Sequence, residues 1–485
     1  MAESYRVCIG GEWADGGAGT YEIVNPATEQ VVAHAPQASV EQSLAATQAA
    51  SEAFESWSRT TPEYRASLLE AAADLLDARL DEFIPIVQAE TGATMRVAKT
   101  LQVPQAGARF RRYARGALEP TIDPLPPAVM PNTPLAPGGL ISAVARRAPV
   151  GVVSCITSYN FPMTNMAGKI GPALAMGNTV VVKPAPQDPI GVIKLVELMH
   201  DAGFPPGVIN VVCGTDIPAS EALVSSPHVD MISFTGSTGV GRRIGEVAGG
   251  DMKRLLLELG GKGACIVFDD ADLKAAIGGI ASVWGFHSGQ ICTAPTRVIA
   301  QRGIYDQLVA GLQMAAKHMK VGDPLERDTV VGPVITGVHR ARVEGYIESA
   351  RAEGAEIAAG GDRGGMDSGF FVAPTLIANA TNQMTAVREE IFGPVVVVVP
   401  FDDDDEAVAI ANDSDFGLYS YVFTKDTPKA WSVAQRLRSG NVGINSLQRN
   451  HEAPFGGFKQ SGVGRDGGSY GLLAYSEMQS IVWPG

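Results

Sequence analysis

The order of hydrophobic and polar residues predicts short strands at the start of the chain and long helices after them. Within residues 1–35, brief alternating runs are separated by Gly-Gly and Asn-Pro pairs that favour turns. Residues 40–57 and 62–91 then place apolar side chains three and four positions apart, the spacing of an amphipathic helix. We therefore expect a strand-rich opening followed by two helical stretches.

From residue 150 onward, short apolar runs alternate with amphipathic stretches. The predicted strands are 150–157, 179–183, 208–212, 231–235 and 255–259, and the predicted helices are 163–175, 191–202, 219–225 and 239–247. This alternation is typical of βαβ units, so it predicts an α/β fold built on a parallel sheet. A second alternating run over 263–445 predicts a second α/β domain, and the apolar segment 394–401 is expected to be a buried strand.

Residues 118–139 interrupt these patterns, because proline recurs there too often for a helix. A surface linker would have such a composition. A segment of this length without structure of its own is nevertheless uncommon inside a compact domain. We therefore predict an arm that leaves one domain and docks elsewhere, and a strand-like C-terminal segment at 470–485.

The length and charge limit the class of protein. A chain of 485 residues has room for several domains of about 100–200 residues each. The formal net charge of −14 argues against duplex nucleic acid as a partner, which needs clustered Lys and Arg side chains. No apolar segment is long enough to cross a membrane, and the N-terminus lacks a signal-peptide pattern. We therefore expect a cytoplasmic protein with no membrane partner.

The 5 cysteines are an odd number in a long chain, which favours reduced thiols over a disulfide framework. No CxxC pair or HExxH motif is present, so no metal site is expected. Cys292 lies in the segment GQICTAP, where Gly289 and small neighbours let the backbone approach a ligand closely. It is either a nucleophile or a buried inert thiol. His287 suggests a Cys-His pair, but closeness in sequence does not establish closeness in space.

Two further polar residues lie at the ends of predicted strands. Glu258 ends an apolar strand and precedes Gly-Gly, where desolvation would raise its pKa toward a value useful in general-base catalysis. Asn160 lies just past another strand end, where its amide could stabilise an oxyanion. A solvated strand end and a turn-forming Asn are the alternatives. Ligands bind beyond the carboxyl ends of parallel strands, which favours functional roles.

Candidate phosphate contacts lie at other strand ends. Ser237 and Thr238 open a predicted helix, whose free N–H groups and dipole attract a phosphate. Lys183 is a cation at the end of another predicted strand, where it could hold a ribose or phosphate. The segment 462–467 also matches GxGxxG, but no strand precedes it within a βαβ unit, so we reject it as a dinucleotide fingerprint.

Several motifs then fit one family together. Between residues 156 and 465 the chain contains, in this order, ITSYNFP, GPALAMGNTVVVKP, FTGSTGVG, LELGGKG, GQICTAPTR, EEIFGPV and PFGGFKQSGVGR. With IGGEW and NPAT near the start, the ordered set resembles the aldehyde dehydrogenase superfamily over essentially the whole chain, in its NAD(P)-dependent, non-acylating form.

The resemblance implies a dimer or tetramer whose subunit has three parts: a Rossmann-like cofactor domain, an α/β catalytic domain and a β-arm for oligomerisation. The implied boundaries are 1–117 and 140–257 for the cofactor domain, 258–445 for the catalytic domain, 118–139 and 470–485 for the arm, and 446–469 for a return segment.

The resemblance also implies roles for individual residues. Cys292 is the nucleophile and Glu258 the base. Asn160 forms the oxyanion hole with the Cys292 backbone N–H, and Lys169 lies in the helix that braces Asn160. The implied cofactor-binding residues are Ile156, Thr157, Ser158, Tyr159, Lys183, Ala185, Pro186, Gly214, Phe234, Gly236, Ser237, Val240, Leu259, Gly260, Glu390 and Phe392. The implied substrate-binding residues are Phe161, Asn165, Gly168, Trp284, Ile291, Thr293, Leu447 and Phe455.

The reaction implied by the resemblance is the oxidation of an aldehyde to its carboxylic acid with NAD(P)+. The Cys292 thiolate adds to the aldehyde carbonyl, and the oxyanion hole stabilises the adduct. Hydride passes to the nicotinamide and leaves a thioester. Water activated by Glu258 then releases the acid.

The sequence departs from the family pattern at several positions. Pro186 stands where NAD-preferring members usually carry a Glu that binds the ribose 2′-hydroxyl, so we predict NAD binding and leave NADP use open. Gly168 replaces a bulky aromatic, and Asn165 is polar, which predicts a wider or more polar substrate entrance. His287 and Tyr159 replace a common Asn and Trp, and we expect activity to survive both changes.

Three other functions compete with this interpretation. An acylating enzyme would pass the thioester to coenzyme A, but such enzymes generally lack the base that Glu258 supplies. A crystallin-like or scaffold protein on the same fold could lose Cys292 or Glu258, yet both are present. A Cys-His hydrolase would not explain the long βαβ run.

Overall fold

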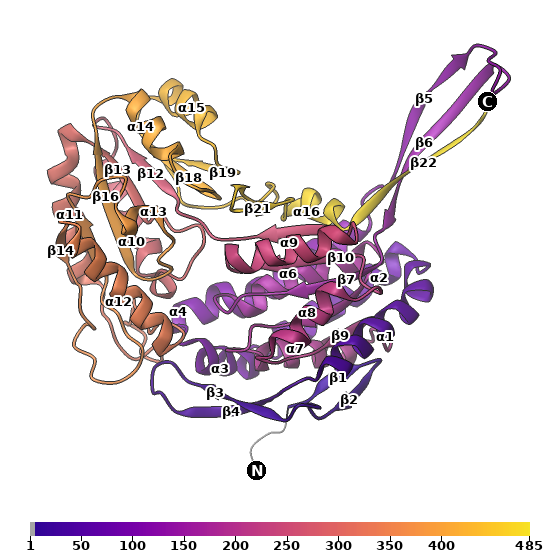
Figure 1. The fold of residues 1–485 in the computed structure, drawn as a ribbon, viewed down its shortest axis with the longest axis horizontal. Helices are drawn as coiled ribbons and strands as arrows, with labels where there is room; N and C mark the ends of the chain where they lie inside the picture. Colours follow the sequence, from indigo (N-terminus) through magenta and orange to yellow (C-terminus); the bar gives the residue numbers. More distant parts are fainter. Residues whose placement is uncertain (1–4) are drawn as a thin grey trace.

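The computed structural model describes residues 5–485 (Figure 1). Its first elements are the expected short strands: β1 (Val7–Ile9), β2 (Glu12–Ala14), β3 (Thr20–Val24) and β4 (Val31–Pro36). β1 and β2 form an antiparallel pair, and so do β3 and β4. The prediction of a strand-rich opening is confirmed.

The helical stretches that follow are α1 (Val40–Ser58), α2 (Pro62–Ala78) and α3 (Leu80–Thr91). α1 begins with a capping box, in which the Ser39 side chain and the Gln42 side chain each accept the other residue's backbone N–H. The predicted helix 62–91 is two helices, because Arg79 leaves the helical region with φ −112° and ψ 19°. Sequence patterns did not predict the next elements, α4 (Met95–Val97), the π-helical residues Ala98–Gln102 and α5 (Val103–Ala117).

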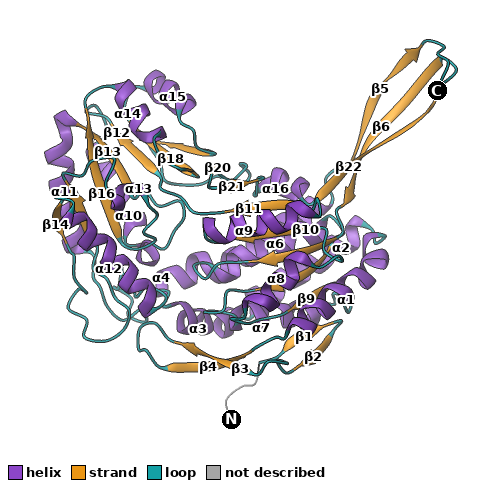
Figure 2. Ribbon diagram, viewed as in Figure 1, coloured by secondary structure: helices purple, strands orange, loops and turns teal. Residues whose placement is uncertain are grey.

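The predicted parallel sheet is confirmed. Its strands are β7 (Val152–Ile156), β8 (Thr179–Lys183), β9 (Ile209–Val211), β10 (Met231–Thr235) and β11 (Arg254–Glu258), joined by α6 (Pro162–Ala175), α7 (Ile190–Asp201), α8 (Ile217–Ser225) and α9 (Thr238–Gly250). Helices cover both faces of the sheet (Figure 2). Alternate side chains of each strand therefore enter different cores: Val180 and Val182 pack against one set of helices, and Val181 against the other.

The order of this sheet is β2-β1-β9-β8-β7-β10-β11-β21, where β21 (Gly462–Val463) is an antiparallel edge strand. From β7 the chain builds outward through β8 and β9, and it then returns to place β10 on the other side of β7. Such a reversal of direction opens a crevice at the carboxyl ends of the two central strands. The loops after β7 and β10 therefore face the same crevice.

A second sheet has the order β14-β15-β16-β13-β12-β18-β19 and is parallel except for the edge strand β14. Its strands are β12 (Ala264–Val267), β13 (Arg297–Gln301), β14 (Glu356–Ala359), β15 (Thr375–Ala378), β16 (Val395–Phe401), β18 (Tyr419–Phe423) and β19 (Asn441–Ile444). The helices that cover it are α10 (Leu273–Trp284), α11 (Tyr305–His318), α12 (Gly337–Ala352), α13 (Thr385–Arg388), α14 (Asp404–Asn412) and α15 (Thr427–Arg436). Residues 259–263 lead directly from β11 in the first sheet to β12 in the second.

Three strands form an arm that projects away from the rest of the molecule (Figure 1). They are β5 (Ile122–Met130), β6 (Gly139–Pro149) and β22 (Ser476–Pro484), in the order β22-β6-β5. The arm leaves apolar side chains in solvent, among them Val129 at 81% and Val482 at 59% exposure. Exposed apolar side chains of this kind mark an interaction surface. The domain boundaries and the oligomerisation role of the arm stay predictions.

None of the helices in residues 5–485 combines the length and the hydrophobicity that crossing a membrane requires.

Candidate active site

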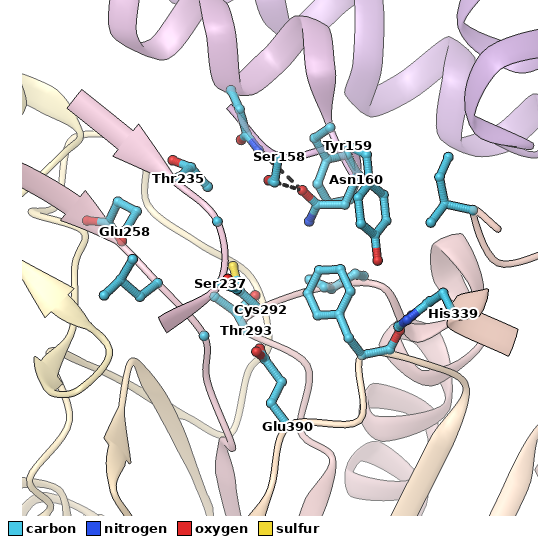
Figure 3. Close-up of a pocket in the computed structure, with 18 of the residues that line it drawn as sticks. Ser158, Tyr159, Asn160, Thr235, Ser237, Glu258, Cys292, Thr293, His339 and Glu390 are labelled. Carbon is cyan, nitrogen blue, oxygen red and sulfur yellow. Dashed lines mark hydrogen bonds between the residues drawn. The ribbon is translucent and has the colours of Figure 1, made fainter. Parts of the chain in front are cut away.

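A cavity of about 370 Å³ opens between the two sheets. The first sheet contributes the loops that follow β7, β10 and β11, which carry Asn160, Ser237 and Glu258. The second sheet contributes the loop before β13, with Cys292, and the loop before β16, with Glu390. Residues that are far apart in sequence therefore surround one space (Figure 3).

Cys292 follows a tight left-handed turn. His287, Ser288 and Gly289 all have positive φ, of 49°, 56° and 68°. Two consecutive non-glycine residues in this region are strained, so surrounding contacts must hold them. The Ser288 hydroxyl donates to the Gly332 carbonyl at 2.7 Å. The turn is therefore anchored to a neighbouring loop, and it fixes where the next residues begin.

Gln290 links this turn to the oxyanion candidate. Its side-chain oxygen accepts the Ile335 N–H at 3.0 Å, and its side-chain nitrogen donates to the His287 carbonyl at 3.1 Å. Its backbone carbonyl accepts the Asn160 Nδ2 at 3.0 Å. The Asn160 amide is thus held against the cysteine loop from the opposite sheet.

Two hydrogen-bond donors remain free beside the thiol. Within residues 5–485, the Cys292 backbone N–H donates to no other residue and contacts only the thiol of Cys292 itself. Asn160 Nδ2 bonds only the Gln290 carbonyl, so its second N–H also has no acceptor in the described chain. Gly261 permits the close approach of the cysteine loop, because a Cβ there would lie 2.4 Å from the Cys292 carbonyl oxygen. A free backbone N–H paired with a free amide N–H is the donor set of an oxyanion hole.

The sulfur of Cys292 rests as a thiol. Cys292 is partly exposed to the cavity, whereas Cys8, Cys155, Cys213 and Cys265 are buried. Burial raises the pKa of Cys292 to about 12, and the nearby Glu390 adds to the rise, while Arg449 opposes it. Forming the thiolate therefore requires a group that takes the proton.

Glu258 ends β11, and both of its carboxyl oxygens are buried without a hydrogen-bond partner in residues 5–485. Burial, followed by the charge of Asp466, raises the pKa of Glu258 well above its usual range, and Lys169 works in the opposite direction. A buried carboxyl group without a hydrogen-bond partner lowers the stability of the fold, and groups of this kind are found mainly at functional sites. The rise expected from the sequence is confirmed in its direction.

Lys169 is buried below the site on α6. Its ammonium donates to the Ser233 hydroxyl at 3.1 Å, and Ser233 is 2.7 Å from the Tyr475 hydroxyl. Burial lowers the pKa of Lys169, while the charges of Asp466 and Glu258 raise it. The side chain joins the helix that follows Asn160 to β10, which supports the bracing role.

The crevice at the switch point fits a dinucleotide. Ser237 caps α9 by accepting the Val240 N–H. The Thr238 and Gly239 N–H groups make no hydrogen bond within residues 5–485, and a Cβ on Gly239 would meet open space. Free N–H groups at an open helix N-terminus suit a phosphate group.

Two side chains flank the crevice where the sugars of a dinucleotide would lie. Lys183 is buried, and within residues 5–485 its ammonium has only the carbonyls of Pro184 and Gly214 as partners, at 3.4 and 3.3 Å. Burial lowers the pKa of Lys183. Glu390 accepts the Gly261 N–H at 2.8 Å, and burial raises the pKa of its carboxyl to about 7. A ribose hydroxyl would give either group a further partner.

Most of the predicted site residues surround the cavity. Those that line it are Ser158, Tyr159, Asn160, Phe161, Asn165, Gly236, Ser237, Glu258, Leu259, Gly260, Ile291, Cys292, Thr293, Glu390, Phe392 and Phe455. Those that lie outside its lining are Ile156, Thr157, Gly168, Lys169, Lys183, Ala185, Pro186, Gly214, Phe234, Val240, Trp284 and Leu447.

Three of the substrate predictions differ from the structure. Trp284 is buried in the second core, where its indole N–H donates to the Pro394 carbonyl at 2.8 Å. Leu447 packs against the same core. Gly168 does not widen the cavity, because Arg109 fills the space: a Cβ on Gly168 would lie 1.8 Å from Arg109 Nη1.

Sequence reasoning also missed residues that line the cavity. They are Arg109, Gln187, Thr235, Ile335, Thr336, Val338, His339, Arg342, Arg449 and Asp466. Only hydrophobic periodicity on α5 could have indicated Arg109, and Arg449 lies in a loop that carries no motif. Only tertiary packing brings these residues to the wall of the cavity.

The two sequence features that we set aside stay outside the chemistry. His287 does not line the cavity: it packs against Phe161 with ring centroids 5.2 Å apart, and burial lowers its pKa to about 4. The GxGxxG segment starts in β21, an antiparallel edge strand that pairs with β11. It therefore lacks the βαβ setting of a dinucleotide fingerprint, as predicted.

Comparison with known proteins agrees with this geometry. The sequence model of the aldehyde dehydrogenase family matches residues 13–481. Mitochondrial succinate-semialdehyde dehydrogenase of Oryza sativa subsp. japonica is 38% identical over 475 residues, which cover 98% of this chain and 88% of the rice protein.

Solved structures show the same fold. Betaine aldehyde dehydrogenase of Staphylococcus aureus in complex with NAD+ is 36% identical, with a TM-score of 0.94, and the match covers 99% of this chain and 95% of that one. An NADP-dependent enzyme of E. coli is 34% identical, with a TM-score of 0.94 and coverage of 99% and 98%.

Proposed function

The chain belongs to the aldehyde dehydrogenase family, and on that premise we propose that Cys292, Asn160 and Glu258 carry out its reaction, the oxidation of an aldehyde to a carboxylic acid. The observation that carries this assignment is the cavity itself, which these three residues line together although they come from separate loops. NAD+ is the cofactor, and NADP+ is the alternative because Pro186 puts no carboxylate against a 2′-phosphate.

The first step is the addition of the Cys292 sulfur to the aldehyde carbon. The thiol loses its proton to solvent water, the S–C bond forms, and the carbonyl oxygen becomes an oxyanion. The free N–H groups of Cys292 and Asn160 are the donors available to that oxyanion. A donor of this kind contributes a few kcal/mol, which is about 10²- to 10³-fold in rate. A dinucleotide held by Lys183, Ser237 and Glu390 would supply the acceptor for the hydride that leaves the former aldehyde carbon.

The second step releases the product from the sulfur. Water attacks the thioester carbon, Glu258 takes the proton of that water, and the C–S bond breaks to free the carboxylic acid and the thiolate. Glu258 suits this role because its carboxyl oxygens have no other partner and its raised pKa makes it a stronger base than an ordinary Glu.

The competing functions make different demands on the site. Transfer of the thioester to coenzyme A would need no water-activating base, yet Glu258 lines the cavity. A hydrolase based on Cys292 and His287 lacks its histidine, because His287 lies outside the cavity. A scaffold role would leave the two free oxyanion donors without a purpose. The name of the rice relative places it in mitochondria, so the cytoplasmic location stays a prediction.

The test compares variants on a panel of aliphatic, aromatic and carboxylate-bearing aldehydes, followed by NADH absorbance. Cys292→Ala should bind NAD+ normally and show no turnover. Cys265→Ala, which removes a buried thiol of β12, is the matched control and should keep wild-type turnover. Turnover by Cys292→Ala, or acid formation that depends on coenzyme A, would contradict the proposal.

A further inference from the structure

Two arginine side chains line the cavity at positions that the proposed chemistry does not use. Arg109 comes from α5, and Arg449 comes from the loop after β19. They are 340 positions apart in sequence, yet the charge of Arg109 lowers the pKa of Arg449, and both side chains line the same cavity as Cys292. An arginine that faces an active-site cavity has five N–H donors in a planar fork that matches a carboxylate or phosphate.

The fold makes room for Arg109. Gly168 on α6 has no side chain, and a Cβ there would lie 1.8 Å from Arg109 Nη1 and 3.0 Å from Cζ. Any larger residue at 168 would therefore displace the guanidinium. In the described part of the chain, Arg109 has one ionic contact, with Asp466 Oδ2 at 3.7 Å, and 23% of its side chain stays exposed. This distance is too long for a hydrogen bond, so the donors of Arg109 remain available.

Arg449 is held in place without using its donors. Its guanidinium carbon lies 3.8 Å from the centroid of the Phe455 ring, a stacked cation–π contact. Within residues 5–485 it has no hydrogen bond or ion pair. Burial and the charge of Arg109 lower the pKa of Arg449, while Cys292 and Asp466 raise it. Stacking orients the plane of the fork and leaves its edge free to face a ligand.

The charges around this part of the cavity do not cancel. Glu258 and Glu390 both have raised pKa values, so burial reduces the negative charge that they bring. Asp466 is then the remaining acidic residue of the lining, against Arg109 and Arg449. Arg342 and His339 line the same cavity but are already engaged, with the carbonyls of Glu390 and Phe392. Arg342 keeps its charge when it bonds a neutral carbonyl, so the lining of the cavity carries a net positive charge that its acidic residues do not match.

We propose that Arg109 and Arg449 bind a carboxylate at the far end of the substrate, so that the preferred substrates are aldehydes that also carry a carboxylate. This inference rests on the proposed function of the site, and it adds the substrate class. A carboxylate brings the negative charge that this part of the cavity lacks, and its two coplanar oxygens pair with the planar guanidinium fork. Its oxygens would fill the free donors, and binding it would fix the aldehyde carbon in place beside the sulfur.

The first experiment compares each carboxylate aldehyde with its own methyl ester, which has nearly the same shape and no charge. Suitable pairs are 4-oxobutanoate, 5-oxopentanoate and 4-carboxybenzaldehyde with the corresponding methyl esters. We expect kcat/KM to be about 100-fold higher for the carboxylate of at least one pair, mostly through a lower KM. Equal values in every pair, or a stronger preference for glyceraldehyde 3-phosphate, would overturn the inference.

The second experiment removes the two charges. Arg109→Met and Arg449→Met should each lower kcat/KM for the carboxylate by about tenfold or more, and leave the methyl ester within about threefold. Lysine at either position should retain part of the preference. Arg111→Met is the matched control, because Arg111 lies on the same helix, pairs with Asp74 and Asp77, and does not line the cavity.

The outcomes distinguish a failure of the proposed carboxylate binding from a failure of the proposed aldehyde oxidation. Loss of activity toward carboxylate and ester alike in Arg109→Met would mean that Arg109 only supports the fold through Asp466, which overturns the inference. Turnover of every aldehyde without a charge preference would also overturn it and leave the proposed function intact. Absence of turnover for all aldehydes in the wild-type enzyme would overturn the proposed function itself.

Discussion

At the scale of single residues, burial in the active site disfavours the charged forms of Cys292 and Glu258. Burial raises the pKa of Cys292 to about 12 and the pKa of Glu258 well above its usual range. A thiol in this state resists oxidation and unwanted addition better than a thiolate does. The rate must then depend on how readily each group loses its proton.

This state predicts a pH dependence whose sign follows from the pKa shifts. Both groups act in their deprotonated forms and both pKa values are raised, so the active fraction grows as the pH rises. We expect kcat/KM to increase from neutral to alkaline pH, where a Glu of ordinary pKa would already be fully ionised. Glu258→Gln should leave the rise in kcat/KM, which reports acylation by Cys292, nearly unchanged and should remove the part of the rise in kcat that comes from hydrolysis. A kcat/KM profile that is flat above neutral pH would contradict the shifts.

Substitution of Glu258 separates the two chemical steps. Glu258→Gln keeps the shape of the side chain but cannot take a proton from water, so acylation should proceed and hydrolysis should stall. We expect a burst of NADH equal to the concentration of active sites, followed by turnover at least about 100-fold slower than wild type. Rapid-mixing absorbance and mass analysis of the acylated Cys292 check this. Steady turnover without a burst would assign the base elsewhere.

At the scale of elements, the arm formed by β5, β6 and β22 has the least support from the rest of its own chain. Its apolar side chains are exposed, and a three-stranded sheet needs a covered face to be stable. The oligomer implied by the sequence resemblance would cover it.

A charge placed on the arm should therefore break the oligomer. Val129→Asp and Val482→Asp should both lower the mass measured by analytical ultracentrifugation, because a desolvated carboxylate is costly in an apolar interface. Met252→Asp, at a residue 88% exposed just after α9, is the matched control and should leave the mass unchanged. An unchanged mass in both arm variants would mean that another surface joins the subunits.

At the scale of the whole molecule, the cavity lies between two sheets, which residues 259–263 connect in one direction and residues 445–461 connect on the return of the chain. Loops from both sheets line the cavity, so a bound dinucleotide would touch both halves of the chain. Binding to the native state alone stabilises a protein by RT ln(1 + [L]/Kd), which is about 2.7 kcal/mol at a hundred times Kd.

Thermal unfolding with each dinucleotide tests this coupling and the cofactor choice together. We expect NAD+ to raise the melting temperature of the wild-type protein and of Cys292→Ala alike, because the thiol is not needed for binding. NADP+ should also raise it, and kcat/KM for NADP+ should lie within about 100-fold of that for NAD+. Pro186→Glu should reduce use of NADP+ and leave that of NAD+ nearly unchanged. A larger preference for NAD+ in the wild type would refute dual use.

The sequence by itself determined the parallel sheets, the strand ends and the positions of Cys292, Glu258 and Asn160. The strands and their ends follow from local periodicity, whereas the roles of the three residues follow from the ordered family motifs, because the local pattern left an alternative open for each. The same local information missed α5, since its segment carries no motif and mixes Pro and Gly with its apolar positions.

Only the tertiary structure decided how distant side chains share space. It showed that the backbone carbonyl of Gln290 holds the Asn160 side chain. It also showed that the Arg109 guanidinium occupies the space beside Gly168, so this glycine does not widen the cavity. It also set the pKa shifts of Cys292 and Glu258, because burial is a property of the packed chain and not of a motif. Contacts between residues hundreds of positions apart leave no periodic signal in one sequence. The positive charge that Arg109 and Arg449 bring to the cavity could therefore be inferred only from the folded structure.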